Sequence, residues 1–342
     1  MKRRREVIEI PIQPVQVIEH VFVERTCPLC QERLVPRDVL GDVVVGTQRL
    51  GHHVTSLIAT LREAGRWPIR LIQWYLETIH QLHLSVGAIV EVVKRVAEAG
   101  RATVREIRER IRASEVVMAD ETGWREDGTN GYVWTFCTDQ ERYFLRRGRG
   151  KVVVDEVLGD TFRGVLVSDF YAAYNHYEGV HQRCWAHLLR DVHELKEMYP
   201  EDKGVHEWAE GIHQVYQQAT EFESSDERER LRAQQHFEAM ILERCRPYLK
   251  DKEAVQRRLS QRIQRFLPEL FVFVSNLLVP ADNNEAERSL RPLVTSRKVS
   301  GGTRSSKGSD AKMLLASLFG TWKVRGMNPF VACRGLVSST EF

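Results

Sequence analysis

The sequence contains no apolar run that approaches the length of a membrane span, and the basic residues Lys2–Arg5 are followed by no apolar signal core. These absences argue against a membrane protein and predict a cytosolic one. Cysteine is scarce as well. Among the six cysteines only Cys27 and Cys30 lie close together, which argues against a framework of disulfide bonds.

The sequence also has little net charge, +3 over 342 residues, so the total does not indicate a nucleic-acid partner. The distribution of charge is more informative. Between residues 288 and 309 there is no acidic residue, but there are six cations: Arg288, Arg291, Arg297, Lys298, Arg304 and Lys307. Local basic surface attracts a phosphate backbone more than total charge does, so this run predicts contact with DNA. A flexible surface loop is the structural alternative.

Length and apolar patterning suggest several domains. With 342 residues, 42% of them hydrophobic, the chain can bury a large core and form two or three domains. We expect segment boundaries at 1–46, 47–113, 114–199, 200–279 and 280–342. The first segment is strand-like and interrupted by proline. The fourth is almost purely helical and too long for a loop, so we expect a helical insertion with solvated, charged faces.

The second segment, 47–113, has the pattern of three short helices over Gln48–Ala64, Ile69–Gln81 and Val86–Ala99. Glycine, proline and serine at their ends supply the usual start and stop signals. Short helices with tight connections fit a DNA-binding helix-turn-helix bundle, and a plain helical bundle fits the same pattern.

The third segment has the pattern of a mixed α/β sheet. Strand-like runs end at Asp120 and Asp169, a hairpin is expected over 131–146, and a fifth strand over His181–Trp185. The expected helices are Lys151–Leu158, one that begins at Tyr171, and His187–Met198. This order of elements is the one that a ribonuclease-H-like sheet requires, although the strand pattern alone supports only a mixed α/β fold.

Asp120 and Asp169 share a position at the end of an apolar strand. Carboxylates there project to the edge where open α/β sheets bind ligands, although an aspartate at such a place often only caps a turn. Oxygen ligands favour Mg²⁺ or Mn²⁺ over zinc. Two such ions about 3.5–4 Å apart can assist both oxygens in phosphodiester transfer, and a third carboxylate from a helix would complete the site.

Three blocks of the sequence stand out: Ala119–Trp124, Ser168–Tyr174 and Asp282–Pro292. They resemble the catalytic blocks of an insertion-sequence DDE transposase family, the group numbered sixty-six. The resemblance extends to residues 84–89, 297–305 and 326–330 and therefore covers nearly the whole chain. It implies a ribonuclease-H-like catalytic core with an Asp-Asp-Glu triad, whose third carboxylate follows the helical insertion.

By this resemblance Asp120 and Asp169 are the two catalytic aspartates. The third block contains both Glu285 and Glu287, and the family places its glutamate directly before the arginine, which selects Glu287. Residues two apart on a helix point in different directions, so both glutamates cannot line the site equally. Glu121, next to Asp120 on a strand, is expected to point to the other side.

Three more residues are candidates near this site. Cys184 and His187 form a Cys-x-x-His that resembles one found after the second aspartate in several DDE superfamilies. As half of a zinc site they lack partners, and the alternative to a role near the substrate is packing against the sheet. Trp124 is either a residue that stacks on an unpaired base or a buried core residue.

Cys27 and Cys30 resemble one half of a zinc ribbon, but a structural zinc site needs four ligands. The family carries another cysteine pair upstream of a segment like Arg5–Pro11, so we expect an upstream part to be missing. His52 and His53 could replace it, whereas adjacent histidines on an amphipathic helix are more often at the surface. Zinc is therefore the less favoured cofactor, and Mg²⁺ or Mn²⁺ the favoured one.

Together these features predict a DNA transposase that cuts at insertion-sequence ends and joins the freed 3′-hydroxyl to target DNA. Its partners would be the terminal inverted repeats, target DNA and, as an option, accessory proteins. Pairing of two ends predicts a homodimer or larger assembly, at the nucleoid in the cytoplasm. A nuclease of the same fold without strand transfer and a truncated, non-catalytic DNA-binding relic are the alternatives.

Overall fold

The structure, a computed structural model, describes residues 6, 8, 10, 14–34 and 48–339. It falls into two compact units, one formed by Met1–Ala102 with Arg325–Phe342 and the other by Thr103–Val324. Within the first unit, the C-terminal helix groups with the N-terminal helices. In the part of the chain that the structure describes, no helix has the length and hydropathy needed to cross a bilayer.

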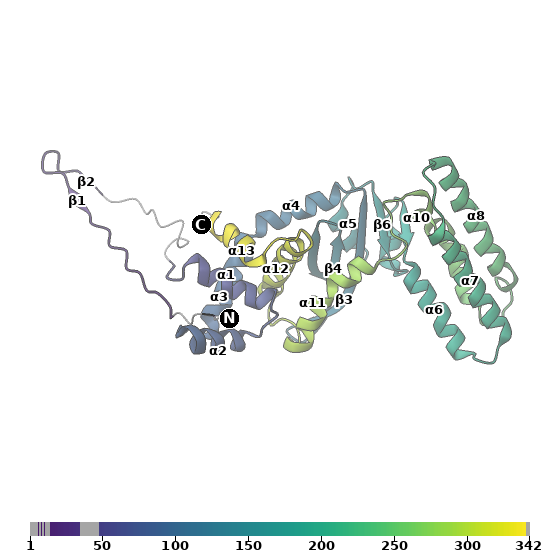
Figure 1. Ribbon diagram of the computed structural model, residues 1–342, viewed down its shortest axis with the longest axis horizontal. Helices are drawn as coiled ribbons and strands as arrows, with labels where there is room; N and C mark the ends of the chain where they lie inside the picture. Colours follow the sequence, from purple (N-terminus) through teal and green to yellow (C-terminus); the bar gives the residue numbers. More distant parts are fainter. Residues whose placement is uncertain (1–5, 7, 9, 11–13, 35–47, 340–342) are drawn as a thin grey trace, which may run out of the picture. The chain divides into compact units, whose positions relative to one another are not determined.

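The first unit is a small helical bundle (Figure 1). Its helices are α1 (His52–Glu63), α2 (Ile69–His80), α3 (Val86–Ala99) and α13 (Pro329–Ser339). Ile58, Ile72 and Ile89 are completely buried in its core. Ser85 caps α3 by accepting the Ala88 N–H at 3.1 Å. The first three helices lie within a few residues of the ranges expected from the sequence.

Near the N-terminus, β1 (Arg25–Thr26) and β2 (Arg33–Leu34) pair in antiparallel fashion. The turn between them carries Cys27 and Cys30. A hydrogen bond of 2.9 Å from the Gln31 N–H to the Cys27 carbonyl closes this turn. The described part of the first segment therefore contains two short strands.

The second unit is built on a mixed five-stranded sheet with the order β5-β4-β3-β6-β7. Its strands are β3 (Val116–Glu126), β4 (Thr129–Cys137), β5 (Arg142–Arg147), β6 (Val165–Ser168) and β7 (His181–Arg183). β3, β4 and β5 form an antiparallel meander, whereas β3, β6 and β7 run parallel. The predictions of a mixed α/β fold and of a β4–β5 hairpin are confirmed.

Two elements differ from the sequence-based expectation. The strand expected to end at Asp120 continues to Glu126, because β3 keeps pairing with β4 after its parallel pairing with β6 ends at Met118. The helix expected to begin at Tyr171 is a short 3-10 helix, η2 (Ala172–His176). A fourth helix, α4, follows the three that were named within the helical segment 47–113. It spans Arg101–Arg112 and buries Val104, Ile107 and Ile111 at helical spacing.

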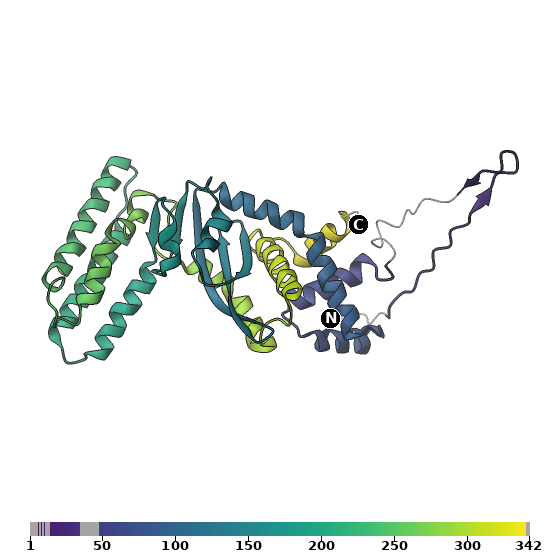
Figure 2. The same cartoon turned by 180° about the vertical axis from the view of Figure 1, so that it is seen from behind.

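The two faces of the sheet pack against different helices (Figures 1 and 2). The covering helices besides α4 are α5 (Val152–Leu158), α11 (Asn284–Ser300) and α12 (Ser306–Val324). Successive side chains on a strand point to opposite faces. Accordingly Val117 and Ala119 pack into a core with residues of α4 and α5, whereas Met118 packs with Ala286 of α11.

The chain between β7 and α11 is almost entirely helical. Its α-helices are α6 (Trp185–Met198), α7 (Lys203–Glu221), α8 (Glu227–Cys245), α9 (Arg257–Arg265) and α10 (Val272–Ser275). They share an apolar core that includes Trp185, Trp208 and Phe271. Asp202 and Asp226 cap α7 and α8 by accepting backbone N–H groups at 3.1 Å and 3.0 Å. This helical group therefore has a core of its own, to which α6 contributes.

Candidate active site at the end of the parallel strands

Asp120 and Asp169 occupy equivalent positions on neighbouring strands. Met118 of β3 pairs with Val167 of β6 in parallel register, and each aspartate follows its strand partner by two residues. Alternation along a strand therefore assigns both to the face of Met118 and Val167, which α11 covers. The negative charge of Asp169 also raises the pKa of Asp120, which shows that the two carboxylates interact. Two of the residues expected from the sequence thus come together where the parallel pairing ends.

Glu121 belongs to the opposite face, as expected. Its carboxylate accepts a hydrogen bond from the Tyr174 hydroxyl at 2.7 Å and forms an ion pair with Arg149 at 2.8 Å. Tyr174 lies in the core on that face. Burial raises the pKa of Glu121, although these two partners oppose the shift. Glu121 is therefore engaged by a tyrosine and an arginine on the face of β3 opposite to Asp120.

Asn283 ties the start of α11 to this end of the sheet and is completely buried. Its side-chain amide donates to the Ala119 carbonyl at 2.7 Å, and its backbone N–H donates to the Cys184 sulfur at 3.1 Å. The Cys184 N–H donates in turn to the Ser168 carbonyl at 2.8 Å. Asn283 therefore joins the strand of Asp120, the start of α6 and the helix that carries the two candidate glutamates.

Asn283→Ala is expected to destabilise the protein by about 1–3 kcal/mol, because it leaves the buried Ala119 carbonyl without its hydrogen bond. Urea denaturation followed by circular dichroism measures this difference. Asn284→Ala is the matched control, since the Asn284 amide donates only to the neighbouring Asp282 carboxylate, at 2.7 Å. Equal losses of stability in the two variants would contradict the anchoring role of Asn283.

The two glutamates of α11 have different surroundings. Glu285 forms ion pairs with Arg142 at 2.8 Å and with Arg288 at 2.6 Å. The hydrogen bond from Arg288, together with the charge of Arg142, lowers the pKa of Glu285. Among the described residues, no arginine or lysine forms an ion pair with Glu287, whose negative charge acts on Asp120. Glu287 is therefore the better placed of the two to act with the aspartates.

Burial makes Asp120 difficult to ionise. Burial raises the pKa of Asp120 to about 7, and repulsion from Glu121, Asp169 and Glu287 adds to the shift, while the Glu121 N–H opposes it with a hydrogen bond of 2.8 Å. In the described chain, no lysine or arginine is ion-paired with Asp120 or Asp169. A divalent cation would supply the missing positive charge, so this set of oxygen donors fits Mg²⁺ or Mn²⁺.

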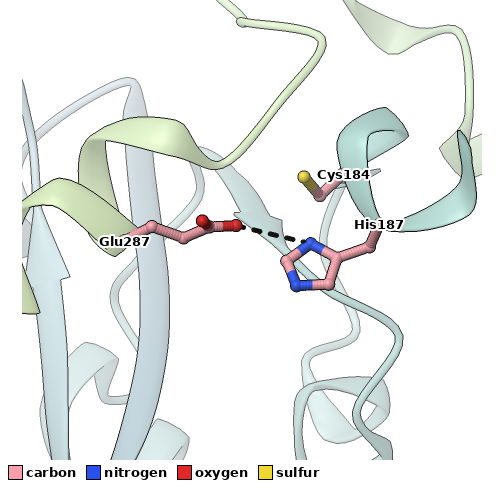
Figure 3. Close-up of side chains that lie close together, drawn as sticks. All are labelled: Cys184, His187 and Glu287. Carbon is pink, nitrogen blue, oxygen red and sulfur yellow. Dashed lines mark ion pairs between the residues drawn. The ribbon is translucent and has the colours of Figure 1, made fainter. Parts of the chain in front are cut away.

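Cys184 and His187 lie next to the third carboxylate (Figure 3). The ligand atoms of Cys184, His187 and Glu287 are all within 4.8 Å of one another, and His187 Nδ1 lies 3.7 Å from Glu287 Oε1. Burial raises the pKa of Cys184 to about 11, although backbone N–H groups oppose the shift. The Cys-x-x-His, which lacks metal-binding partners in the sequence, therefore has a carboxylate neighbour in the fold.

The six cations of the basic run do not share one environment. Arg288 is paired with Glu285, and Arg297 donates to the Gly123 carbonyl and, at 3.4 Å, to the Thr122 hydroxyl. Arg297 therefore fits a role in holding α11 against β3 better than contact with DNA. The other four cations are exposed: Arg291, Lys298, Arg304 and Lys307.

Trp124 is only 2% exposed, and its indole N–H donates to the Thr303 hydroxyl at 3.1 Å. The core alternative is therefore correct, and stacking on a base is not supported. The loop after α11 is anchored at the same place, since the Thr303 N–H donates to the Arg125 carbonyl at 3.0 Å. A Cβ on Gly302 would lie 2.1 Å from that carbonyl oxygen, so the close approach requires glycine. A flexible loop, the alternative interpretation of this segment, is wrong at this point.

Cys27 and Cys30 lie at the surface, with Cys30 exposed and Cys27 partly buried. Backbone N–H groups of Cys30 and Leu29 lower the pKa of Cys27, which favours the thiolate form that binds metals. Among the described residues, however, no third histidine, cysteine or carboxylate completes a metal site around this pair. Zinc binding here stays a prediction.

The two adjacent histidines, expected at the surface or as zinc ligands, belong to the packing of α1 and α13. His52 is 3% exposed, and its Nδ1 lies 2.8 Å from the Ser338 hydroxyl. The expectation of a surface position is therefore wrong for His52, because α13 covers this face of α1. His53 is exposed and meets the Phe330 ring edge-on at 5.9 Å.

Some side chains that hold the site in place were not singled out from the sequence. They are Arg142, Arg183 and Asn283. Arg183 is 1% exposed and donates to the Asp169 carbonyl at 2.8 Å and to the Glu269 carboxylate at 2.6 Å. The only sequence signal was the place of Asn283 inside the third block. The arginines gave none, because their partners lie far away along the chain.

Fold and site together define an α/β protein with interacting carboxylates at one end of a mixed sheet. Comparison with known families makes the assignment specific. Residues 48–311 match the family described as the transposase IS66 family. This match covers most of the chain, which therefore belongs to the IS66 transposase family. The resemblance found in the sequence is thus confirmed.

A curated relative, described as uncharacterized, is also similar to this chain. The "Uncharacterized protein y4qI" of Sinorhizobium fredii (strain NBRC 101917 / NGR234) is 25% identical over 267 residues. The aligned part covers 65% of this chain and 47% of the relative. The chain therefore spans about half the length of the curated relative it matches.

Proposed function

We propose that this protein is a DNA transposase that cuts at the ends of an insertion sequence and joins the freed 3′-hydroxyl to target DNA. Besides membership of the transposase family, one observation carries the proposal: three carboxylates from distant parts of the sequence interact in the fold. Asp120, Asp169 and Glu287 come from β3, from the end of β6 and from α11, and the charges of the latter two act on Asp120. The sheet order, with an antiparallel meander followed by parallel strands, supports a ribonuclease-H-like core.

The three carboxylates would hold Mg²⁺ or Mn²⁺, which when bound acts as a Lewis acid on the attacking and leaving oxygens of the phosphodiester. The chain itself orients these ligands. Asp120 accepts the Glu121 N–H at 2.8 Å, and Asp169 accepts the Tyr171 N–H at 2.9 Å. Glu287 sits on a helix whose start is fixed by a buried amide. Carboxylates held in this way need little rearrangement before the reaction.

Two regions are suited to DNA. The exposed cations of α11, of the loop after it and of α12 lie close in sequence to Glu287 and are free to contact phosphates. The helical bundle of the first unit supports a role for residues 47–113 in binding the terminal inverted repeats, with α2 and α3 as a candidate helix-turn-helix. Pairing two transposon ends would require a dimer or a larger assembly.

Lys298→Ala is expected to weaken DNA binding at every sequence and to reduce the slope of log Kobs against log salt concentration by about 1. The reason is that a lysine contacting a phosphate releases about one counterion. Fluorescence anisotropy over a salt series measures the slope. Lys323→Ala, at an exposed lysine late in α12, is the matched control and is expected to keep the wild-type slope. An unchanged slope for Lys298→Ala would remove this residue from the DNA surface.

One assay separates transposase, nuclease and relic. The full chain is incubated with Mg²⁺, labelled DNA that carries the ends of the encoding element, and supercoiled target DNA. Strand-transfer products support the transposase, and cleavage without joining supports a nuclease of the same fold. A mobility shift without cutting supports a non-catalytic DNA-binding protein.

A further inference from the structure

Cys184 and His187 have no part in the chemistry proposed above, although they converge on one of its carboxylates (Figure 3). Cys184 precedes the first turn of α6, His187 lies in that turn, and Glu287 lies in the first turn of α11. One ligand atom from each residue lies within 4.8 Å of the other two. A thiol, an imidazole and a carboxylate grouped in this way are the usual ligands of a zinc-type ion.

The spacing of His187 and Glu287 fits a shared ion better than a hydrogen bond. Nδ1 and Oε1 are 3.7 Å apart, beyond the limit of about 3.2 Å for a good N–H···O bond. A bridging water with two normal hydrogen bonds would hold them about 4.5 Å apart. Nitrogen and oxygen ligands of one tetrahedral zinc lie about 3.4 Å apart. The observed 3.7 Å between Nδ1 and Oε1 is closest to the separation of two zinc ligands.

Both of these atoms are also buried and lack a hydrogen-bond partner among the described residues. Buried polar atoms without partners are rare, because each loses its hydration without compensation. Here two of them, from different helices, face each other beside a sulfur. A bound cation would satisfy both atoms at once.

The sulfur of Cys184 is surrounded by backbone hydrogen-bond donors. It accepts the Asn283 N–H at 3.1 Å, and the N–H groups of Ala186 and His187 also point to it. It stands at the N-terminal end of α6, where the helix dipole favours an anion. A metal ion would displace the thiol proton, and these donors would then stabilise the bound thiolate.

We propose that Cys184, His187 and Glu287 bind a thiophilic divalent ion, with Zn²⁺ as the expected species and the fourth position open to water. Thiolate and imidazole select Zn²⁺ or Co²⁺, whereas Mg²⁺ prefers oxygen ligands alone. The site therefore differs in metal preference from the acidic site, with which it shares Glu287. If the proposed transposase function holds, Zn²⁺ at this site competes for Glu287 and slows Mg²⁺-dependent cleavage.

Cobalt absorption tests the site without any DNA. The parent protein is the full chain with Cys27→Ser and Cys30→Ser, so that the N-terminal cysteine pair cannot contribute. Titration of the metal-free parent with Co²⁺ is expected to give a near-ultraviolet thiolate-to-cobalt band that saturates at one ion per chain and disappears on adding Zn²⁺. In this parent, Cys184→Ser is expected to abolish the band, and Glu287→Gln to weaken cobalt binding at least tenfold.

Asp120→Asn in the same parent is the matched control, since it removes a carboxylate of the acidic site but none of the three ligands. It is expected to keep the band, and circular dichroism verifies that each variant is folded. No band in the parent, a band that survives Cys184→Ser, or unchanged affinity in Glu287→Gln would overturn the proposal.

The competition is tested separately by cleavage in the same parent. Micromolar Zn²⁺ is expected to slow cleavage, and raising Mg²⁺ to relieve the inhibition. Cleavage that is insensitive to Zn²⁺ would overturn the competition. A protein that binds Co²⁺ as expected but never cuts DNA would instead contradict the proposed transposase function and leave the metal site standing.

Discussion

Asp169→Asn is expected to lower the rate of DNA cleavage by at least about a thousand-fold while the protein stays folded. The change keeps the size of the side chain and an acceptor for the Tyr171 N–H, now bonded at 2.9 Å. It removes one negative charge from the proposed metal ligands. Losing a ligand costs several kcal/mol of transition-state stabilisation, and about 4 kcal/mol corresponds to a thousand-fold in rate.

The rate is measured with enzyme in excess over labelled transposon-end DNA in Mg²⁺. Asp160→Asn is the matched control, because Asp160 is exposed and precedes the same strand. It makes the identical chemical change and is expected to cleave at the wild-type rate. Thermal melting verifies the fold of both variants. Full activity in Asp169→Asn would rule out a mechanism that depends on these carboxylates.

Local patterns predicted the parts of the fold that depend on local contacts. The β4–β5 hairpin is such a part, since its alternation and its turn at Asp139 and Gln140 lie within one short stretch. The length of β3 could not be predicted in the same way. Its second half is a strand only because β4 pairs with it, as in the pairing of Asp120 with Thr135. The grouping of α13 with α1 is likewise a contact between the two ends of the chain.

The candidate site could be named from the sequence, but its physical basis could not. The choice of Glu287 over Glu285 followed a family pattern. The structure adds a reason, because Glu285 accepts a hydrogen bond from Arg142, which is 143 residues distant in the sequence. Similarly, His187 lacked a visible partner until the fold brought Glu287 to within 3.7 Å. Such pairs depend on tertiary packing, about which the spacing of residues in one sequence says nothing.

The metal-free protein is expected to become less stable as the pH rises, because the buried Asp120 must then ionise beside other carboxylates. Asp120→Asn is expected to remove this loss of stability. Burial, with repulsion from nearby carboxylates, raises the pKa of Asp120 from 3.8 to about 7. The folded protein then binds the proton more tightly than the unfolded chain does. Its stability falls as the pH rises from about 4 to about 7, and above about 7 the loss is complete.

Asparagine cannot ionise, so the variant is expected to be more stable than the wild type by a margin that grows through the same pH window. The full shift corresponds to roughly 4 kcal/mol. Because Asp120 is partly exposed, solvent screens some of this energy, and we expect a margin of about 2 kcal/mol at pH 8 and clearly less at pH 5.

Urea denaturation in the presence of a chelator, at pH 5 and pH 8, measures the margin. Asp139→Asn, in the exposed turn between β4 and β5, is the matched control and is expected to show none. Replacing the chelator with Mg²⁺ is expected to stabilise the wild type more than Asp120→Asn, because a bound cation cancels the repulsion that the variant already lacks. A margin that is the same at both pH values would mean that packing, and not charge, limits stability at this site. The acidic cluster would then lose its main argument as a cation site, since the pH-dependent cost of its unbalanced charge is what a metal ion would remove.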